Sequence, residues 1–201
     1  MVKILIIGSG AREHVVAETL KKSKDVKLYS YMNSMNPGIE SLSEVVEVGD
    51  FDDFELLTKF ASYVKPDFAF IGPEAPLAAG VADILEEIGI PSVGPKKELA
   101  KLESSKSFTR ELVQEYGING NPKFLVVKKS NLDESREFME KLSGVVIKPD
   151  GLTGGKGVKV QGDHFDTIDE AIKYCKEVLK LHPNVVIEDK LEGEEFSLMC
   201  F

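Results

Sequence analysis

The chain has 201 residues, an ordinary apolar fraction of 42% and a net charge of −9 that is spread without long blocks of one sign. This composition predicts a folded chain with a real core, as one large or two small domains. The dispersed charge argues against nucleic acid or a membrane surface as a partner, and no segment approaches a membrane span. Its two cysteines, Cys175 and Cys200, are too few for a disulfide framework or a zinc site, so we expect a cytoplasmic protein.

Residues 1–100 alternate between strand and helix patterns. Strands are predicted at residues 3–7, 26–31, 45–48, 67–71 and 91–93. Helices are predicted at residues 11–22, 52–64 and 77–88. This alternation predicts an α/β fold, a Rossmann-like parallel sheet with helices on both faces. Ligands of such sheets bind at the carboxyl ends of the strands.

Residues 96–116 read as two helical pieces, and glycine and proline residues then break the pattern. A second, smaller α+β module follows. Its strands are predicted at residues 124–127, 145–148, 157–161 and 185–188, and its helices at 132–142 and 168–179. Residues 194–201 form a strand pattern with no turn or polar tail, so we expect the chain to be part of a longer protein.

The densest candidate site is the loop KPDGLTGGKGV at residues 148–158. Its glycines can bring backbone N–H groups close to an anion, and Lys148 and Lys156 add positive charge. These glycines are Gly151, Gly154, Gly155 and Gly157. The loop is not a Walker A motif, since Asp150 and Gly157 occupy positions that need Gly and Ser or Thr, and strands flank it on both sides. We predict a β-hairpin flap that closes over a nucleotide triphosphate; the alternative is a mobile hairpin with solvated lysines.

A second candidate site follows the first predicted strand. Its residues are Gly8, Ser9, Gly10, Arg12, Glu13 and His14. Gly8 and Gly10 begin a dinucleotide fingerprint, but Glu13 replaces its third glycine and no acid follows the second strand, so NAD is not expected. A glycine turn into a helix still binds anions, and Arg12 could add a phosphate contact. The alternative is a tight turn with its charged residues in solvent.

Three further segments have both a functional and an ordinary interpretation. Gly72, Pro73 and Glu74 follow the fourth predicted strand, where the carboxylate could bind sugar hydroxyls or an amine, or simply start a helix. Lys106 opens a helix with serine caps and could reach a phosphate or lie in water. Residues 188–195 follow a strand and could bind adenine and ribose, or form an acidic surface turn.

Five segments in this order resemble the phosphoribosylamine–glycine ligase family of ATP-grasp enzymes: GSGAREH, GPEAPL, SSKSFTRE, VVIKPDGLTGGKGV and IEDKLEGEEFS. The resemblance covers the whole chain. It implies a substrate-binding domain at 1–100, a helical linker at 101–122, a small ATP-grasp subdomain with the flap at 123–191, and a truncated large subdomain at 192–201. Phosphoribosylamine would bind residues 8–14 and 72–77.

ATP is the cofactor that the resemblance implies. Its phosphates would contact Lys106, Lys148 and the flap. Its adenine would lie against Glu188, Asp189, Lys190 and Leu191, and its ribose at Glu195. Mg²⁺ would bridge the phosphates, with ligands expected beyond residue 201 and none assigned within the chain.

The implied reaction belongs to purine biosynthesis and joins glycine to 5-phosphoribosylamine. The glycine carboxylate would attack the γ-phosphate of ATP, and the amine would displace phosphate from the glycyl phosphate. Lys148 and Lys156 are then the candidate catalytic residues, because their charges oppose those of the phosphates. We expect this chain alone to be inactive. Two alternatives stay open: another ATP-grasp ligase or carboxylase, and a nucleotide-binding module without catalysis.

Overall fold

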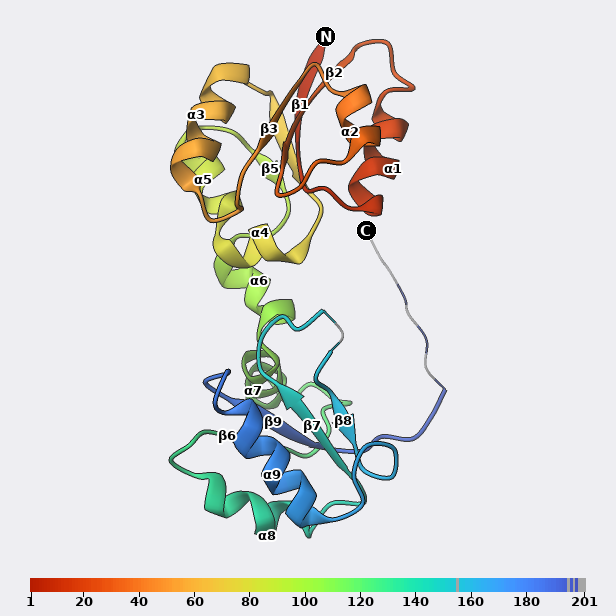
Figure 1. Ribbon diagram of the computed structural model, residues 1–201, viewed down its shortest axis with the longest axis vertical. Helices are drawn as coiled ribbons and strands as arrows, with labels where there is room; N and C mark the ends of the chain where they lie inside the picture. The colour runs from red at the N-terminus through yellow and green to blue at the C-terminus, as the bar shows by residue number, and fades with distance from the viewer. Residues whose placement is uncertain (155, 195, 197, 199–201) are drawn as a thin grey trace. The chain divides into compact units, whose positions relative to one another are not determined.

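The computed structural model describes residues 1–154, 156–194, 196 and 198 (Figure 1). The chain divides into two compact units, Met1–Ser104 and a second that begins at Ser105. The boundary falls within residues 101–122, which were predicted as a linker: the first four belong to the first unit and the rest to the second. Among the described residues, no helix is long and apolar enough to span a membrane.

The first unit is built on a parallel sheet with the strand order β3-β2-β1-β4-β5. Its strands are β1 (Val2–Ile7), β2 (Val26–Met32), β3 (Val45–Val48), β4 (Phe68–Ile71) and β5 (Ser92–Val93). Ile7 at the end of β1 lies opposite Tyr31 in β2 and Ile71 in β4. The carboxyl ends of these three strands therefore meet at one edge, which confirms the predicted α/β sheet.

Helices cover both faces of this sheet (Figure 1). Alternate residues of β1 point to opposite faces. Ile4 and Ile6 pack with α1 (Ala11–Leu20) and α2 (Pro37–Leu42), whereas Leu5 and Ile7 pack with α3 (Phe54–Val64) and α5 (Val81–Glu87). A further helix, α6 (Lys97–Ser104), adds Ala100 to the second cluster.

Two details of the first unit differ from the prediction. The helix expected at residues 77–88 is two helices, α4 (Glu74–Ala79) and α5, because Gly80 takes a left-handed conformation with φ of +110° between them. The helix α2 was not predicted. This helix is short and contains Gly38, so its pattern in the sequence is weak. Asn36 caps its start, where the Asn36 side chain accepts a hydrogen bond from the Gly38 N–H.

The second unit has an antiparallel sheet with the order β6-β9-β7-β8. Its strands are β6 (Phe124–Val127), β7 (Val145–Pro149), β8 (Lys159–Val160) and β9 (Val185–Asp189). Its helices are α7 (Lys106–Glu115), α8 (Ser135–Met139) and α9 (Ile168–Val178), with a 3₁₀ turn at Leu132–Glu134. The predicted α+β module is confirmed, although the helix expected at 132–142 is shorter and begins with that turn.

The core of the second unit lies between its sheet and α9. Ile147 and Ile187 are fully buried in the sheet, and Ala171 and Cys175 are fully buried on the helix. Burial raises the pKa of the Cys175 thiol to about 12. The strand predicted for residues 194–201 falls mostly outside the described residues.

We predict that the first unit depends on the face of α3 that meets the sheet. Leu57 is fully buried there, whereas Tyr63 on the same helix is 74% exposed. Leu57→Ala should lower the free energy of unfolding by about 2–5 kcal/mol, because it leaves a cavity. Tyr63→Ala should change it by less than about 0.5 kcal/mol. Hydrogen exchange of the β1 amides measures both, and equal protection in the two variants would contradict the packing described here.

Candidate nucleotide and substrate sites

Two loops meet at the carboxyl edge of the first sheet. The Gly72 N–H after β4 donates to the Ile7 carbonyl of β1 at 3.1 Å. Arg12 Nη2 donates to Glu74 Oε1 at 2.8 Å, which joins the start of α1 to the start of α4. This hydrogen bond raises the pKa of Arg12 and lowers the pKa of Glu74. The structure therefore brings together the two segments that the sequence proposed for substrate.

The glycines of these loops are needed for close packing. Gly8 has φ of +130°, and a Cβ at this position would lie 2.7 Å from both Pro73 Cδ and Glu13 Cγ. A Cβ at Gly72 would overlap the Glu13 carboxylate. Side chains at either position would push the two loops apart, so space requires glycine at both, and the positive φ of Gly8 favours glycine there as well.

Glu13 is buried between these loops, with only 2% of its surface exposed. Its Oε2 atom accepts a hydrogen bond of 2.7 Å from the Gly10 N–H. Its Oε1 atom has no hydrogen-bond partner among the described residues. A buried carboxylate oxygen without a donor is costly, and this one could accept a hydrogen bond from a ligand. The alternative of a solvated Glu13 is therefore wrong.

Ser9 and His14 also make local contacts at this edge. Ser9 Oγ donates to Asn33 Oδ1 at 2.6 Å, just after β2. The His14 ring packs so closely over the start of α2 that a side chain at Gly38 would overlap it. The sequence analysis missed Asn33, although its position at the end of the second strand was visible.

The glycine-rich loop of the second unit connects two paired strands. Val146 in β7 lies opposite Val160 in β8, so the predicted hairpin is confirmed. Gly151, Gly154 and Gly157 have φ of +105°, +58° and +85°, all in the region that favours glycine. Lys156 is exposed, and Gly155 lies outside the described residues.

Tyr174 on α9 holds the far end of this hairpin loop. Its hydroxyl donates to the Gly157 carbonyl at 2.6 Å, and its ring lies beneath the Lys159 ammonium, 4.0 Å from the ring centroid. The sequence analysis missed Tyr174. The contact fixes the backbone one residue after Lys156, while the Lys156 side chain itself stays exposed.

Lys106 lies at the base of the loop. Its Nζ atom donates to the Gly151 carbonyl at 2.7 Å from the first residue of α7. Burial lowers the pKa of Lys106; the negative charge of Asp150 opposes this shift, and the positive charge of Lys148 adds to it. The interpretation of Lys106 as a solvated side chain is therefore wrong. Lys106 and Lys148, both predicted to contact phosphate, lie close enough for the charge of Lys148 to act on Lys106.

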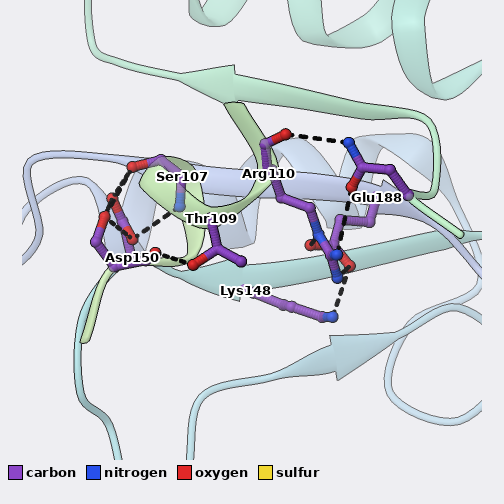
Figure 2. Close-up of polar contacts among 8 residues, drawn as sticks. Ser107, Thr109, Arg110, Lys148, Asp150 and Glu188 are labelled. Carbon is purple, nitrogen blue, oxygen red and sulfur yellow. Dashed lines mark hydrogen bonds and ion pairs between the residues drawn. The ribbon is translucent and has the colours of Figure 1, made fainter. Parts of the chain in front are cut away.

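Asp150 connects the start of α7 to the base of the flap (Figure 2). Its carboxylate accepts hydrogen bonds from the Ser107 N–H at 3.2 Å, the Ser107 hydroxyl and Asn184 Nδ2 at 3.1 Å. Burial alone would raise the pKa of Asp150, but the hydrogen bonds from Ser107 and Asn184 outweigh it and lower the pKa. The sequence had assigned no contact to Asp150, because its partners lie far away along the chain.

Glu188 accepts hydrogen bonds from two cations (Figure 2). Arg110 Nε lies 2.7 Å from Oε1, and Lys148 Nζ lies 2.6 Å from Oε2. Burial would raise the pKa of Glu188, but the hydrogen bonds from Arg110 and Lys148 outweigh it and lower the pKa. The sequence analysis missed Arg110, although it follows Lys106 by four residues and so shares its face of the helix.

The remaining predicted adenine contacts already take part in the fold. Asp189 Oδ1 accepts a hydrogen bond from the Ser143 N–H at 2.9 Å. The N–H groups of Asp189 and Lys190 donate to the carbonyls of Lys123 and Gly144 at 2.9 and 2.8 Å. An adenine bound along this segment would therefore have to contact other backbone groups. Leu191 is 69% exposed, and Glu195 lies outside the described residues.

Comparison with known proteins identifies the family. The N domain of phosphoribosylglycinamide synthetase matches residues 2–103, and the ATP-grasp (A) domain of the same enzyme matches residues 104–201. The chain belongs to the phosphoribosylglycinamide synthetase family. It is 47% identical to the phosphoribosylamine–glycine ligases of Methanopyrus kandleri and Methanocaldococcus jannaschii, and covers 46% of each. These alignments include 100% and 99% of the chain, which thus spans about half the length of the curated relatives it matches.

Solved structures of synthetases share the fold. The phosphoribosylamine–glycine ligase of Thermotoga maritima matches 96% of the chain and 45% of its own length, at a TM-score of 0.71 and 26% identity. The N5-carboxyaminoimidazole synthetase of Staphylococcus aureus, crystallised with ADP, matches 94% of the chain and 48% of its own length, at a TM-score of 0.74 and 18% identity. The second likeness concerns the fold alone.

The buried acids predict how the second unit responds to pH. The pKa values of Asp150 and Glu188 are lowered on folding from ordinary values of 3.8 and 4.5. Both acids therefore stabilise the unit above about pH 4.5, and this contribution is lost as the pH falls through the lowered values. Glu188→Gln should reduce stability at pH 7 and make the decline in acid shallower.

Urea unfolding at several pH values, followed through NMR signals of β9, measures this dependence. Glu115→Gln, at an exposed position on α7, is the control and should keep the wild-type pH profile. An unchanged acid decline in Glu188→Gln would show that Glu188 does not contribute to it.

Proposed function

We propose that this chain supplies the 5-phosphoribosylamine-binding unit and the ATP phosphate-binding unit of a phosphoribosylamine–glycine ligase. The observation that carries the proposal is the match of one synthetase family to both units, together with lysines at the base of a glycine-rich flap. The reaction would use ATP to join glycine to 5-phosphoribosylamine, giving glycinamide ribonucleotide, ADP and phosphate through a glycyl phosphate. The cytoplasm is the compartment we propose for it, as a step of purine biosynthesis.

The second unit would bind the ATP phosphates. Lys106 and Lys148 lie close enough for each charge to act on the other, and both lie beside the flap base. Phosphoryl transfer needs little covalent chemistry from the protein, so fixed positive charge and flap closure are suitable contributions. Lys156 on the exposed flap would add its charge on closure, and its neighbour Gly157 is already held by Tyr174.

The first unit would bind 5-phosphoribosylamine at the edge where its loops meet. Backbone N–H groups at the start of α1 suit the phosphate. The Arg12–Glu74 pair offers both charges at this edge, and the open Oε1 atom of Glu13 offers an acceptor for a hydroxyl or an amine. The described residues contain no group of three or more His, Cys, Asp or Glu side chains that could hold a metal.

An assay with the protein expressed from its complete reading frame tests the function. ATP, glycine and 5-phosphoribosylamine should give glycinamide ribonucleotide, detected by mass spectrometry, and bicarbonate should not replace glycine. Arg12→Ala and Glu74→Ala should each lower turnover roughly tenfold or more while ATP affinity stays the same, since the first loses a contact to the phosphate and the second a contact to a sugar hydroxyl or the amine. Product formation with bicarbonate but not with glycine would favour a carboxylase instead.

ATP affinity itself should depend on the two flap lysines to different extents. Lys148→Ala should weaken ATP binding by about 1.5–3 kcal/mol, because a preformed charge-assisted contact is lost. Lys156→Ala should have a smaller effect, because an exposed flap loses entropy when it closes. Calorimetric titration measures both, with Lys141→Ala, which removes an exposed ion pair to Glu137, as the control. Unchanged affinity in both lysine variants would contradict the assignment of the flap.

A further inference from the structure

Three charged side chains from three elements meet in the second unit. The Glu188 side chain on β9 is 4% exposed, and those of Arg110 on α7 and Lys148 on β7 are each 25% exposed. The Arg110 guanidinium binds both carboxylate oxygens, with Nε 2.7 Å from Oε1 and Nη2 3.2 Å from Oε2. Lys148 Nζ lies 2.6 Å from the same Oε2 (Figure 2). Two positive charges and one negative charge leave the group a net charge of +1.

Arg110 is held in place by more than this carboxylate. Its Nη1 atom donates to Asn121 Oδ1 at 3.4 Å, and Asn121 Nδ2 donates back to the Arg110 carbonyl at 3.0 Å. Both the backbone and the guanidinium of Arg110 are therefore tied to the segment that follows α7. A planar fork fixed in this way defines the plane and position of the carboxylate that it binds.

The orientation of Lys148 follows from that of Glu188. The lysine ammonium is a point charge on a flexible stem, and its Nζ atom donates to the Glu188 Oε2 atom. Without Arg110, Glu188 and Lys148 would form an isolated pair of zero net charge, and the ammonium would have to leave that pair to reach an anion. With Arg110 present, the carboxylate is already matched, and Lys148 keeps donors for a second partner.

We propose that Arg110 is a positioning residue for nucleotide binding. It fixes the Glu188 carboxylate, Glu188 fixes Lys148, and the surplus positive charge of the group favours the ATP phosphates. Arg110 itself need not touch the nucleotide. This inference rests on the proposed function, because it assigns Lys148 to the phosphates.

A double-mutant cycle separates positioning from simple charge. Arg110→Met should weaken ATP binding roughly tenfold in the protein with Glu188, as expected for one misplaced charge-assisted contact. The same substitution in the Glu188→Gln background should weaken it by less than about twofold, because no carboxylate is left for Arg110 to hold. ATP affinity is measured by calorimetry on the protein from its complete reading frame.

Equal losses in the two backgrounds would show that Arg110 acts only as a distant charge and would overturn the inference. No loss in either background would also overturn it, while leaving the proposed function intact if the wild type binds ATP. A wild type that binds no ATP would overturn both proposals. A larger loss in the protein with Glu188 than in the Glu188→Gln background supports the chain of contacts from Arg110 to Lys148.

Control variants keep the result interpretable. Arg136 forms an exposed ion pair with Asp169 in the same unit, so Arg136→Met removes an arginine without touching Arg110, Lys148 or Glu188 and should leave ATP affinity unchanged. Thermal unfolding checks that each variant folds. If Arg110→Met does not fold, Arg110→Lys completes the cycle, since it keeps the charge but loses the fork, and it should show a smaller loss with the same dependence on Glu188.

Discussion

A carboxylate removed from water must find hydrogen-bond donors, and this constraint organises both units. Asp150 and Glu188 are buried and fully engaged, the first with neutral donors and the second with two cations. Glu13 is buried as well, yet only one of its oxygens has a partner among the described residues. Asp150 and Glu188 connect segments that are distant in the chain, and Glu13 packs between two loops. Each acid therefore fixes the position of the candidate site residues beside it.

The two acids of the second unit act on different lysines. Asp150 ties the first turn of α7 to the flap base, which places Lys106 beside the Gly151 carbonyl. Glu188 holds Lys148 in the neighbouring strand. Neutral donors satisfy the hydrogen bonding of Asp150, while its negative charge acts on Lys106 and raises the pKa of that lysine. Lys106, Lys148 and Arg110, set against Asp150 and Glu188, leave one positive charge in this region, which favours an anion.

Glycine makes the corresponding arrangement possible in the first unit. Gly8 and Gly72 leave just enough space for the Glu13 side chain to enter between two strand ends. The parallel register then places Arg12 and Glu74 within hydrogen-bond distance at the same edge. The Oε1 atom of Glu13 has no donor among the residues that the structure describes, so it is an open acceptor at this edge.

The sequence by itself predicted the strands of both sheets, most of the helices and the glycine-rich hairpin loop. Periodicity and β-branched runs predicted the strands, and the density of glycine and lysine predicted an anion-binding hairpin in place of a Walker A motif. Only the tertiary structure decided the partners: Arg110 and Glu188 are 78 residues apart, and Ser107 and Asp150 are 43 apart. A local sequence pattern indicates which face of a helix or strand is apolar. It does not indicate the partner of a buried charge, because that partner can come from any segment that the fold places beside it. The inward position of Glu13 has the same origin, since packing between the two strand-end loops settled it.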